Sequence, residues 1–152
     1  MIKLVVITYL INLLMFSGCH SGQDIAGDDQ QISEISLNGK VMDLTNEEKL
    51  EINTMVISSF QTSNDFYELL VTDNLLQSIM ETEQYLEISF VETKTLNTEK
   101  FGEMVVGKLL IPLSGNFAGS DQLTFFSGKK DFSNTPLLNT SGLNKLKELI
   151  DL

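Results

Sequence analysis

The chain has 152 residues, which is enough for one domain and short for two. Its 21 acidic residues outnumber its 10 basic residues, all of which are lysine, and the formal net charge is −11. Nucleic-acid binding depends on cationic side chains that neutralise phosphates, so this composition makes the chain a poor candidate for that class of protein. A single cysteine and a single histidine likewise exclude an internal disulfide framework and the usual zinc clusters.

Residues 1–18 have the composition of an export signal. Lys3 and the amino terminus are positively charged, and residues 4–16 are apolar except for Thr8 and Asn12. A membrane-spanning helix needs about 20 apolar residues, so this run is short for a permanent span. Its length suits the apolar region of a secretory signal that is followed by small residues at a cleavage point.

The only cysteine of the chain stands at that point, in the sequence Phe16-Ser17-Gly18-Cys19. This segment resembles the lipobox of bacterial lipoproteins, in which an aliphatic residue and two small residues precede an invariant cysteine. Phe16 stands where leucine is usual, but the position needs a large apolar group more than a particular one. The resemblance implies that Cys19 is the lipidated first residue of the mature protein and that the protein is held at the membrane through this lipid. A secretory signal with an incidental cysteine and an uncleaved anchor are the alternatives, and both also place the domain outside the cytoplasm.

The residues that follow the cysteine indicate a membrane destination and a spacer. In lipoproteins of bacteria with two membranes, aspartate directly after the cysteine commonly causes retention in the inner membrane, and this chain has His20 there. The resemblance therefore implies delivery to the outer membrane in such a bacterium, facing the periplasm or the cell surface. Residues 19–31 are rich in glycine and aspartate and have few apolar side chains, so they are predicted to form a flexible acidic tether.

Residues 32–152 are predicted to form a single α+β domain. Asn38-Gly39 between alternating apolar residues is typical of a β-hairpin turn. Thr45 and Glu48 have the spacing of a capping box, which predicts a helix that ends near Phe60. The apolar face of this helix is expected to consist of Ile52, Met55, Val56 and Phe60.

The next segment is harder to assign from its pattern. Tyr67, Leu69 and Val71 alternate with Glu68 and Leu70, which suggests a short strand, although a helical turn is also open. Asp73 is expected to cap a second helix. The apolar face of that helix is predicted at Leu75, Leu76, Ile79 and Met80.

Three successive strands are predicted at residues 85–91, 104–113 and 123–126. Short connections between them favour an antiparallel meander, so the expected fold is an antiparallel sheet packed by two or three helices. The nearly continuous apolar strand at residues 104–113 is expected to lie centrally in the sheet. Ser141 is expected to cap a helix at the end of the domain.

Patterns that could support catalysis are incomplete in this chain. Residues 102–108 match the first positions of a phosphate-binding loop, but Leu109 stands where serine or threonine must hold Mg²⁺. His20 is the only possible histidine base and lies beside the anchor, which excludes a Ser-His-Asp triad in the domain. A Ser-Lys pair stays open, as do pairs among carboxylates, although the absence of tryptophan argues against a sugar-cleaving site. The carboxylates considered are Glu81 with Glu83 and Glu87 with Glu92.

We therefore expect a non-catalytic binding or accessory lipoprotein that uses no nucleotide, metal ion or other cofactor. Its partner is expected to be a protein or a glycan of the cell envelope, and loop aromatics are candidate contacts. Two such rings are Phe117 and Phe132, although either could instead fold back to close the core. Residues 19–103 carry 17 acidic residues and 4 lysines, whereas residues 104–152 are nearly neutral. This acidic surface suggests the alternative of an inhibitor or immunity-type lipoprotein that binds a basic protein, although simple solubility also explains it.

Overall fold

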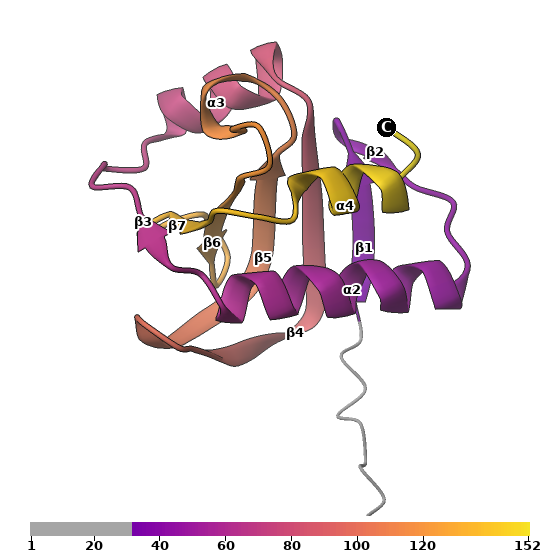
Figure 1. The fold of residues 1–152 in the computed structure, drawn as a ribbon, viewed down its shortest axis with the longest axis horizontal. Coiled ribbons are helices and arrows are strands. Elements are labelled where there is room, and N and C mark those ends of the chain that lie inside the picture. The colour runs from indigo at the N-terminus through magenta and orange to yellow at the C-terminus, as the bar shows by residue number, and fades with distance from the viewer. Residues whose placement is uncertain (1–31) are drawn as a thin grey trace, which may run out of the picture.

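The computed structural model describes residues 32–152, so the export signal, Cys19 and the tether lie outside the described residues. The described part forms a seven-stranded sheet in the order β2-β1-β4-β5-β6-β7-β3 with three α-helices (Figure 1). Every pair of neighbouring strands is antiparallel, and β4 to β7 lie side by side in chain order. The predicted α+β class and its C-terminal meander are therefore confirmed. The elements are β1 (Ile32–Leu37), β2 (Lys40–Val41), α2 (Asn46–Gln61), β3 (Asp65–Phe66), α3 (Asp73–Thr82), β4 (Tyr85–Thr98), β5 (Gly102–Pro112), the 3₁₀ helix η1 (Gly115–Phe117), β6 (Leu123–Gly128), β7 (Leu137–Asn139) and α4 (Leu143–Leu149).

The first hairpin forms as its turn residues predict. Asn38 and Gly39 both adopt positive φ, at 51° and 74°, which is the left-handed conformation that asparagine and glycine tolerate best. The turn places Ser36 opposite Val41 and Leu37 opposite Lys40. β1 in turn pairs with β4, so this hairpin forms one end of the sheet.

Helix α2 begins with the predicted capping box. The backbone N–H of Thr45 donates to Glu48 Oε2 at 2.7 Å, and the backbone N–H of Glu48 donates to Thr45 Oγ1 at 3.3 Å. These two bonds satisfy donors that a helix N-terminus otherwise leaves unpaired. Ile52, Val56 and Phe60 are buried, whereas the predicted Met55 is only partly buried.

Helices α2 and α4 cross the same face of the sheet and enclose the main core (Figure 1). Phe60 of α2 and Phe125 of β6 meet edge to face at the centre of this core, with ring centroids 5.5 Å apart. The strands contribute alternate apolar side chains to the same face, as a half-covered sheet requires. The buried strand residues on this side include Ile35, Leu86, Ile88, Leu109, Ile111 and Leu123.

The opposite face has a smaller core next to α3. Ile79 of α3 packs there with Tyr85 of β4, Leu110 of β5 and Phe126 of β6. Because Tyr85 and Leu86 are adjacent in one strand, they point to opposite faces and belong to different cores. β4 and β5 are thus covered on both sides near α3, and β5 is the middle strand of the sheet as predicted.

Two predictions for the segment between α2 and β4 are wrong. Residues 67–71 form neither a strand nor a helix, and the strand in this region is the preceding pair Asp65 and Phe66, which joins β7. Val71 packs against the smaller core although its backbone is irregular. The cap of α3 is Thr72, whose hydroxyl accepts from Leu75 N at 3.2 Å, and Asp73 is the first helical residue.

The prediction that Ser141 caps the last helix is also wrong. The residue before α4 is Gly142, with φ of 110° and no side chain to act as a cap, and the Ser141 side chain donates to Asn139 Oδ1 instead. The cap comes from Asp121, whose carboxylate accepts from Asn144 N at 2.8 Å. Strand β7, which the pattern did not indicate, is only three residues long and directly follows Pro136.

Candidate binding groove

The hairpin of β4 and β5 extends past the strand that follows it. β4 pairs with β5 as far as Gly102, whereas β6 pairs with β5 only at Lys108, Leu109 and Leu110. After Gly128 the chain leaves β5 and returns as β7 on the far side of β6. Within the described residues, the outer edge of β5 from Gly102 to Gly107 therefore has no neighbouring strand.

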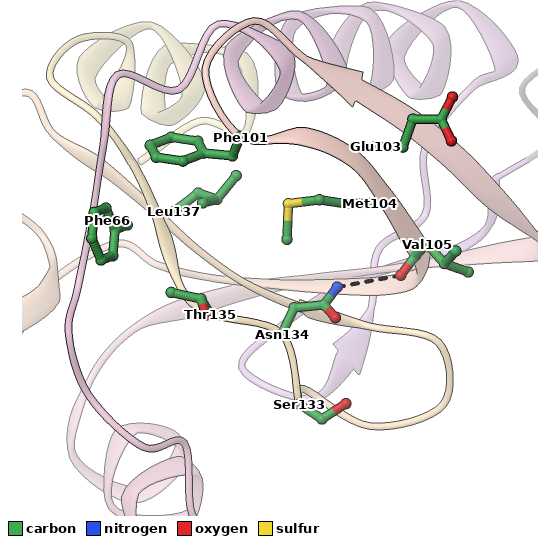
Figure 2. Close-up of a pocket in the computed structure, with 9 residues that line it drawn as sticks. All are labelled: Phe66, Phe101, Glu103, Met104, Val105, Ser133, Asn134, Thr135 and Leu137. Carbon is green, nitrogen blue, oxygen red and sulfur yellow. Dashed lines mark hydrogen bonds between the residues drawn. The ribbon is translucent and has the colours of Figure 1, made fainter.

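An open groove of about 650 Å³ lies along this edge (Figure 2). One wall comes from the turn after β4 and the first half of β5, and the other comes from β3 and the chain leading into β7. Its size is in the range of ordinary ligand sites. The lining residues are Phe66, Phe101, Glu103, Met104, Val105, Ser133, Asn134, Thr135 and Leu137.

Aromatic and flexible apolar side chains line one end of the groove. The rings of Phe66 and Phe101 meet edge to face, with centroids 5.7 Å apart and planes at 75° (Figure 2). Phe66 is 39% exposed and Val105 is 46% exposed, so both present apolar surface to solvent. Exposed apolar side chains gathered at a depression are typical of contact sites, and the flexible Met104 between the walls can adapt to different shapes.

Asn134 connects the two walls through its side chain. Its Nδ2 donates to the carbonyl oxygen of Val105 at 3.3 Å and to Ser127 Oγ at 3.1 Å (Figure 2). Its own backbone N–H donates to the carbonyl oxygen of Ser127 at 2.9 Å. β6 thus holds Asn134 in place, and its contact with β5 is the longest of these three bonds.

The lining of the groove contains one acidic side chain. Glu103 is exposed and is the one ionisable side chain among the nine lining residues. Asp131 lies two residues before the lining Ser133, and hydrogen bonding by the Ser133 side chain lowers the pKa of its carboxyl group. Lys100, near the aromatic end, is already engaged, since its Nζ donates to the carbonyl oxygen of Asn64 at 2.7 Å.

The two aromatic residues that the sequence suggested as contacts lie elsewhere. Phe117 in η1 is half-buried and packs edge to face against Tyr67 and Phe126, with centroids 5.3 and 5.2 Å away. Phe132 is 4% exposed and has Lys108 Nζ 4.1 Å above its ring. Both rings pack in the smaller core, which is the core-closing role that the sequence left as the other interpretation.

The segment that resembles a phosphate-binding loop is a β-strand. Residues 102–109 lie within β5, and the next element after that strand is the short 3₁₀ helix η1. A β-carbon on Gly107 would collide with the backbone carbonyl oxygen of Lys129. The two backbones approach each other so closely here that only glycine fits, which explains why a glycine stands in this strand.

The carboxylates that the sequence offered as possible catalytic pairs are bonded to the backbone, exposed or half-buried on a strand. Glu83 Oε1 accepts from the backbone N–H of Asn116 at 3.2 Å and so ties η1 to the end of α3. Glu81 and Glu92 are exposed, and Glu87 is half-buried on β4. In residues 32–152, no group of three or more histidine, cysteine, aspartate or glutamate side chains is arranged to hold a metal ion.

A smaller groove between α2 and α4 brings a serine and a lysine together. Ser58 and Lys145 line it with Glu51, Thr54 and Met55, and its volume is about 340 Å³. A lysine that activates a serine must be desolvated, whereas both Lys145 and Ser58 are exposed. The larger groove beside β5 is thus the better candidate site.

The sequence did not indicate this groove, because it arises from the different lengths over which β5 pairs with its two neighbours. The exposed Val105 lies in the segment predicted as a central strand, and the pattern predicts no element at Phe66. Among residues 32–152, no helix has both the length and the apolar character that crossing a membrane requires. Comparisons of the chain with models of known protein families, with curated proteins and with solved structures find no match.

Proposed function

We propose that this chain is a lipid-anchored binding lipoprotein that acts outside the cytoplasm and has no catalytic activity of its own. The observation that carries the proposal is the position of the only cysteine. Cys19 directly follows a charged start, a short apolar run and the small residues Ser17 and Gly18. A cysteine placed by chance would rarely coincide with all three of these features.

The proposed anchor has a simple physical basis. Each buried methylene group of an acyl chain contributes about 0.8 kcal/mol to membrane binding, so two or more chains on Cys19 hold the protein durably. The acidic residues Asp24, Asp28 and Asp29 follow, and the described domain itself carries a net charge of −9. Repulsion from anionic lipid keeps such a domain away from the bilayer and accessible to partners.

The groove supports a binding role for the domain. It combines the exposed apolar surface of Phe66 and Val105 with a strand edge whose polar groups have no strand partner. A site of this kind holds a ligand without needing a reactive side chain. Its occupant is expected to be a protein or glycan of the cell envelope.

Metabolic labelling of the full chain with an alkyne fatty acid in a bacterial host tests the anchor. The protein should incorporate label and partition into the detergent phase, and Cys19→Ser should lose both properties. Ser21→Ala, which lies outside the lipobox-like segment, serves as the matched control and should behave like the unmodified chain. Equal labelling of the Cys19→Ser protein would refute the lipoprotein assignment.

The proposed delivery to the outer membrane has its own test in a host with two membranes. His20→Asp introduces the residue that commonly causes inner-membrane retention in lipoproteins. Sucrose-gradient fractionation should therefore find the unmodified protein with the outer membrane and the variant with the inner membrane. An unmodified protein that stays with the inner membrane would contradict this localisation.

The alternative function is an inhibitor or immunity-type lipoprotein that blocks a basic protein. The charge distribution favours it, because residues 32–103 carry 14 acidic residues and only 4 lysines. Association driven by such a surface slows steeply as salt rises, whereas association through an apolar groove responds weakly. The association rate of an isolated partner, measured at low and high ionic strength, distinguishes the two functions.

A further inference from the structure

We propose that the groove beside β5 binds an extended segment of a partner protein, which adds as a strand to the outer edge of β5 and carries basic side chains among apolar ones. This inference deepens the proposed binding function and rests on it. It names the site, the conformation of the ligand and its charge. Three features of the groove support it.

The first feature is the unpaired strand edge. The carbonyl oxygen of Val105 points into the groove, since it accepts the bond from Asn134 Nδ2. Along an antiparallel strand, alternate residues direct both their N–H and C=O groups to the same side. Val105 and Glu103 therefore present donors and acceptors to the groove in the spacing that an extended peptide matches.

The second feature is the space where β6 would continue. β6 ends at Gly128 and leaves the outer edge of β5 without a neighbouring strand from Gly102 to Gly107, where the Asn134 side chain bonds to Val105 and the Lys129 backbone lies close to Gly107. At about 3.3 Å per residue, this edge is about 20 Å long and accommodates a segment of five or six residues. A strand that enters here would replace the bond from Asn134 to Val105, which is longer than the bonds that attach Asn134 to Ser127.

The third feature is the chemistry of the two walls. Side chains of a bound strand alternate between its faces, so one set would contact the apolar groups of Phe66, Phe101 and Leu137. Another set would approach the rim, where Glu103 is the ionisable lining residue. Lysine or arginine at the rim positions would pair with this carboxylate and with the negative charge of the whole domain.

The same charges argue against two other occupants. The tether of this chain contains Asp24, Asp28 and Asp29, and these side chains would lie close to Glu103 if the tether filled the groove. A second copy paired edge to edge would bring two domains of net charge −9 into contact, each with a Glu103 carboxylate on the paired edge. Like charges in such proximity disfavour association, whereas a basic segment is attracted.

An array of random octapeptides, probed with the labelled full chain in detergent, tests the ligand chemistry. Peptides that bind should show alternating apolar residues, enrichment in lysine or arginine and depletion of proline. N-methylation of alternate residues in a selected peptide should weaken binding about tenfold in one register and have little effect in the other, because only one set of N–H groups faces β5. Selection of acidic or proline-rich peptides, or equal effects of both N-methylated forms, would refute strand addition.

Hydrogen exchange and charge reversal test the location. Binding of a selected peptide should slow amide exchange at Glu103 and Val105, and Glu103→Lys should weaken the binding of basic peptides about fivefold. Glu92→Lys makes the same charge change at an exposed β4 residue outside the groove and should leave affinity unchanged. Protection elsewhere on the domain, or equal effects of the two reversals, would refute this site and leave the proposed binding function intact. Loss of fatty-acid labelling with peptide binding retained would refute the anchor and leave the groove assignment intact.

Discussion

Asp121 caps helix α4 through Asn144, although the two residues lie 23 positions apart in the chain. The carboxylate accepts from Asn144 N at 2.8 Å, and the backbone carbonyl oxygen of Asp121 accepts from Leu143 N at 3.1 Å. Two donors at the start of α4 are thus satisfied from the loop before β6. The negative charge of Asp121 also complements the positive end of the helix dipole.

Asp121→Ala should therefore lower the free energy of unfolding by about 1 kcal/mol, which is typical for loss of a helix cap. Urea denaturation followed by circular dichroism measures this difference. Asp43→Ala is the matched control, because Asp43 is an exposed residue in the loop before α2. Equal stability losses in the two variants would show that the Asp121 contact does not hold α4.

This cap also shows what the sequence could not reveal. The Asn38-Gly39 turn and the box of Thr45 and Glu48 were predicted correctly, because each depends on residues at most three positions apart. For α4 the local pattern offered only Ser141 as a cap. The residue that does cap this helix, Asp121, is remote in the chain and comes close only after folding, so the pattern could not indicate it. The groove has the same origin, since β5 is longer than its pairing with β6 and no local pattern records where that pairing ends.

The capping box of α2 predicts a dependence of stability on pH. Two hydrogen bonds to its carboxylate lower the pKa of Glu48 from its ordinary value of 4.5. The larger effect comes from the Thr45 backbone N–H and the smaller from the Thr45 hydroxyl group. A carboxyl group with a lower pKa in the folded state stabilises the protein above its unfolded pKa. This stabilisation is lost as pH falls through the folded pKa.

Glu48→Gln keeps a side chain that suits a capping box but removes the titrating group. The stability advantage of the unmodified protein over this variant should be constant near neutral pH and should shrink as pH falls below about 4.5. Urea denaturation at a series of pH values measures it. An advantage that increased on acidification would contradict the assigned hydrogen bonds.

Gly107 should be intolerant of any side chain. An added β-carbon would collide with the carbonyl oxygen of Lys129 and would lie 3.1 Å from Thr93 Cγ2. Gly107→Ala should therefore destabilise the protein by about 1–3 kcal/mol, as is usual when a well-packed site is overfilled. Gly119→Ala is a suitable control, since the nearest atoms to its β-carbon would be side-chain atoms of Gln122 and not backbone. Thermal denaturation should show the larger loss for Gly107→Ala, and the reverse order would contradict the close approach.

Phe132 should contribute to stability rather than to direct binding. Its ring is buried in the smaller core beneath Lys108, so Phe132→Ala should cost about 3–5 kcal/mol, and Lys108→Met should cost about 0.5–1 kcal/mol through the lost cation–π contact. Phe101→Ala in the groove should instead reduce peptide affinity with a smaller effect on stability, because Phe101 is only partly buried. Urea denaturation and peptide titration of both phenylalanine variants separate the two roles. If Phe132→Ala kept its stability and lost peptide binding, Phe132 would be a contact residue and the role assigned to its ring would be wrong.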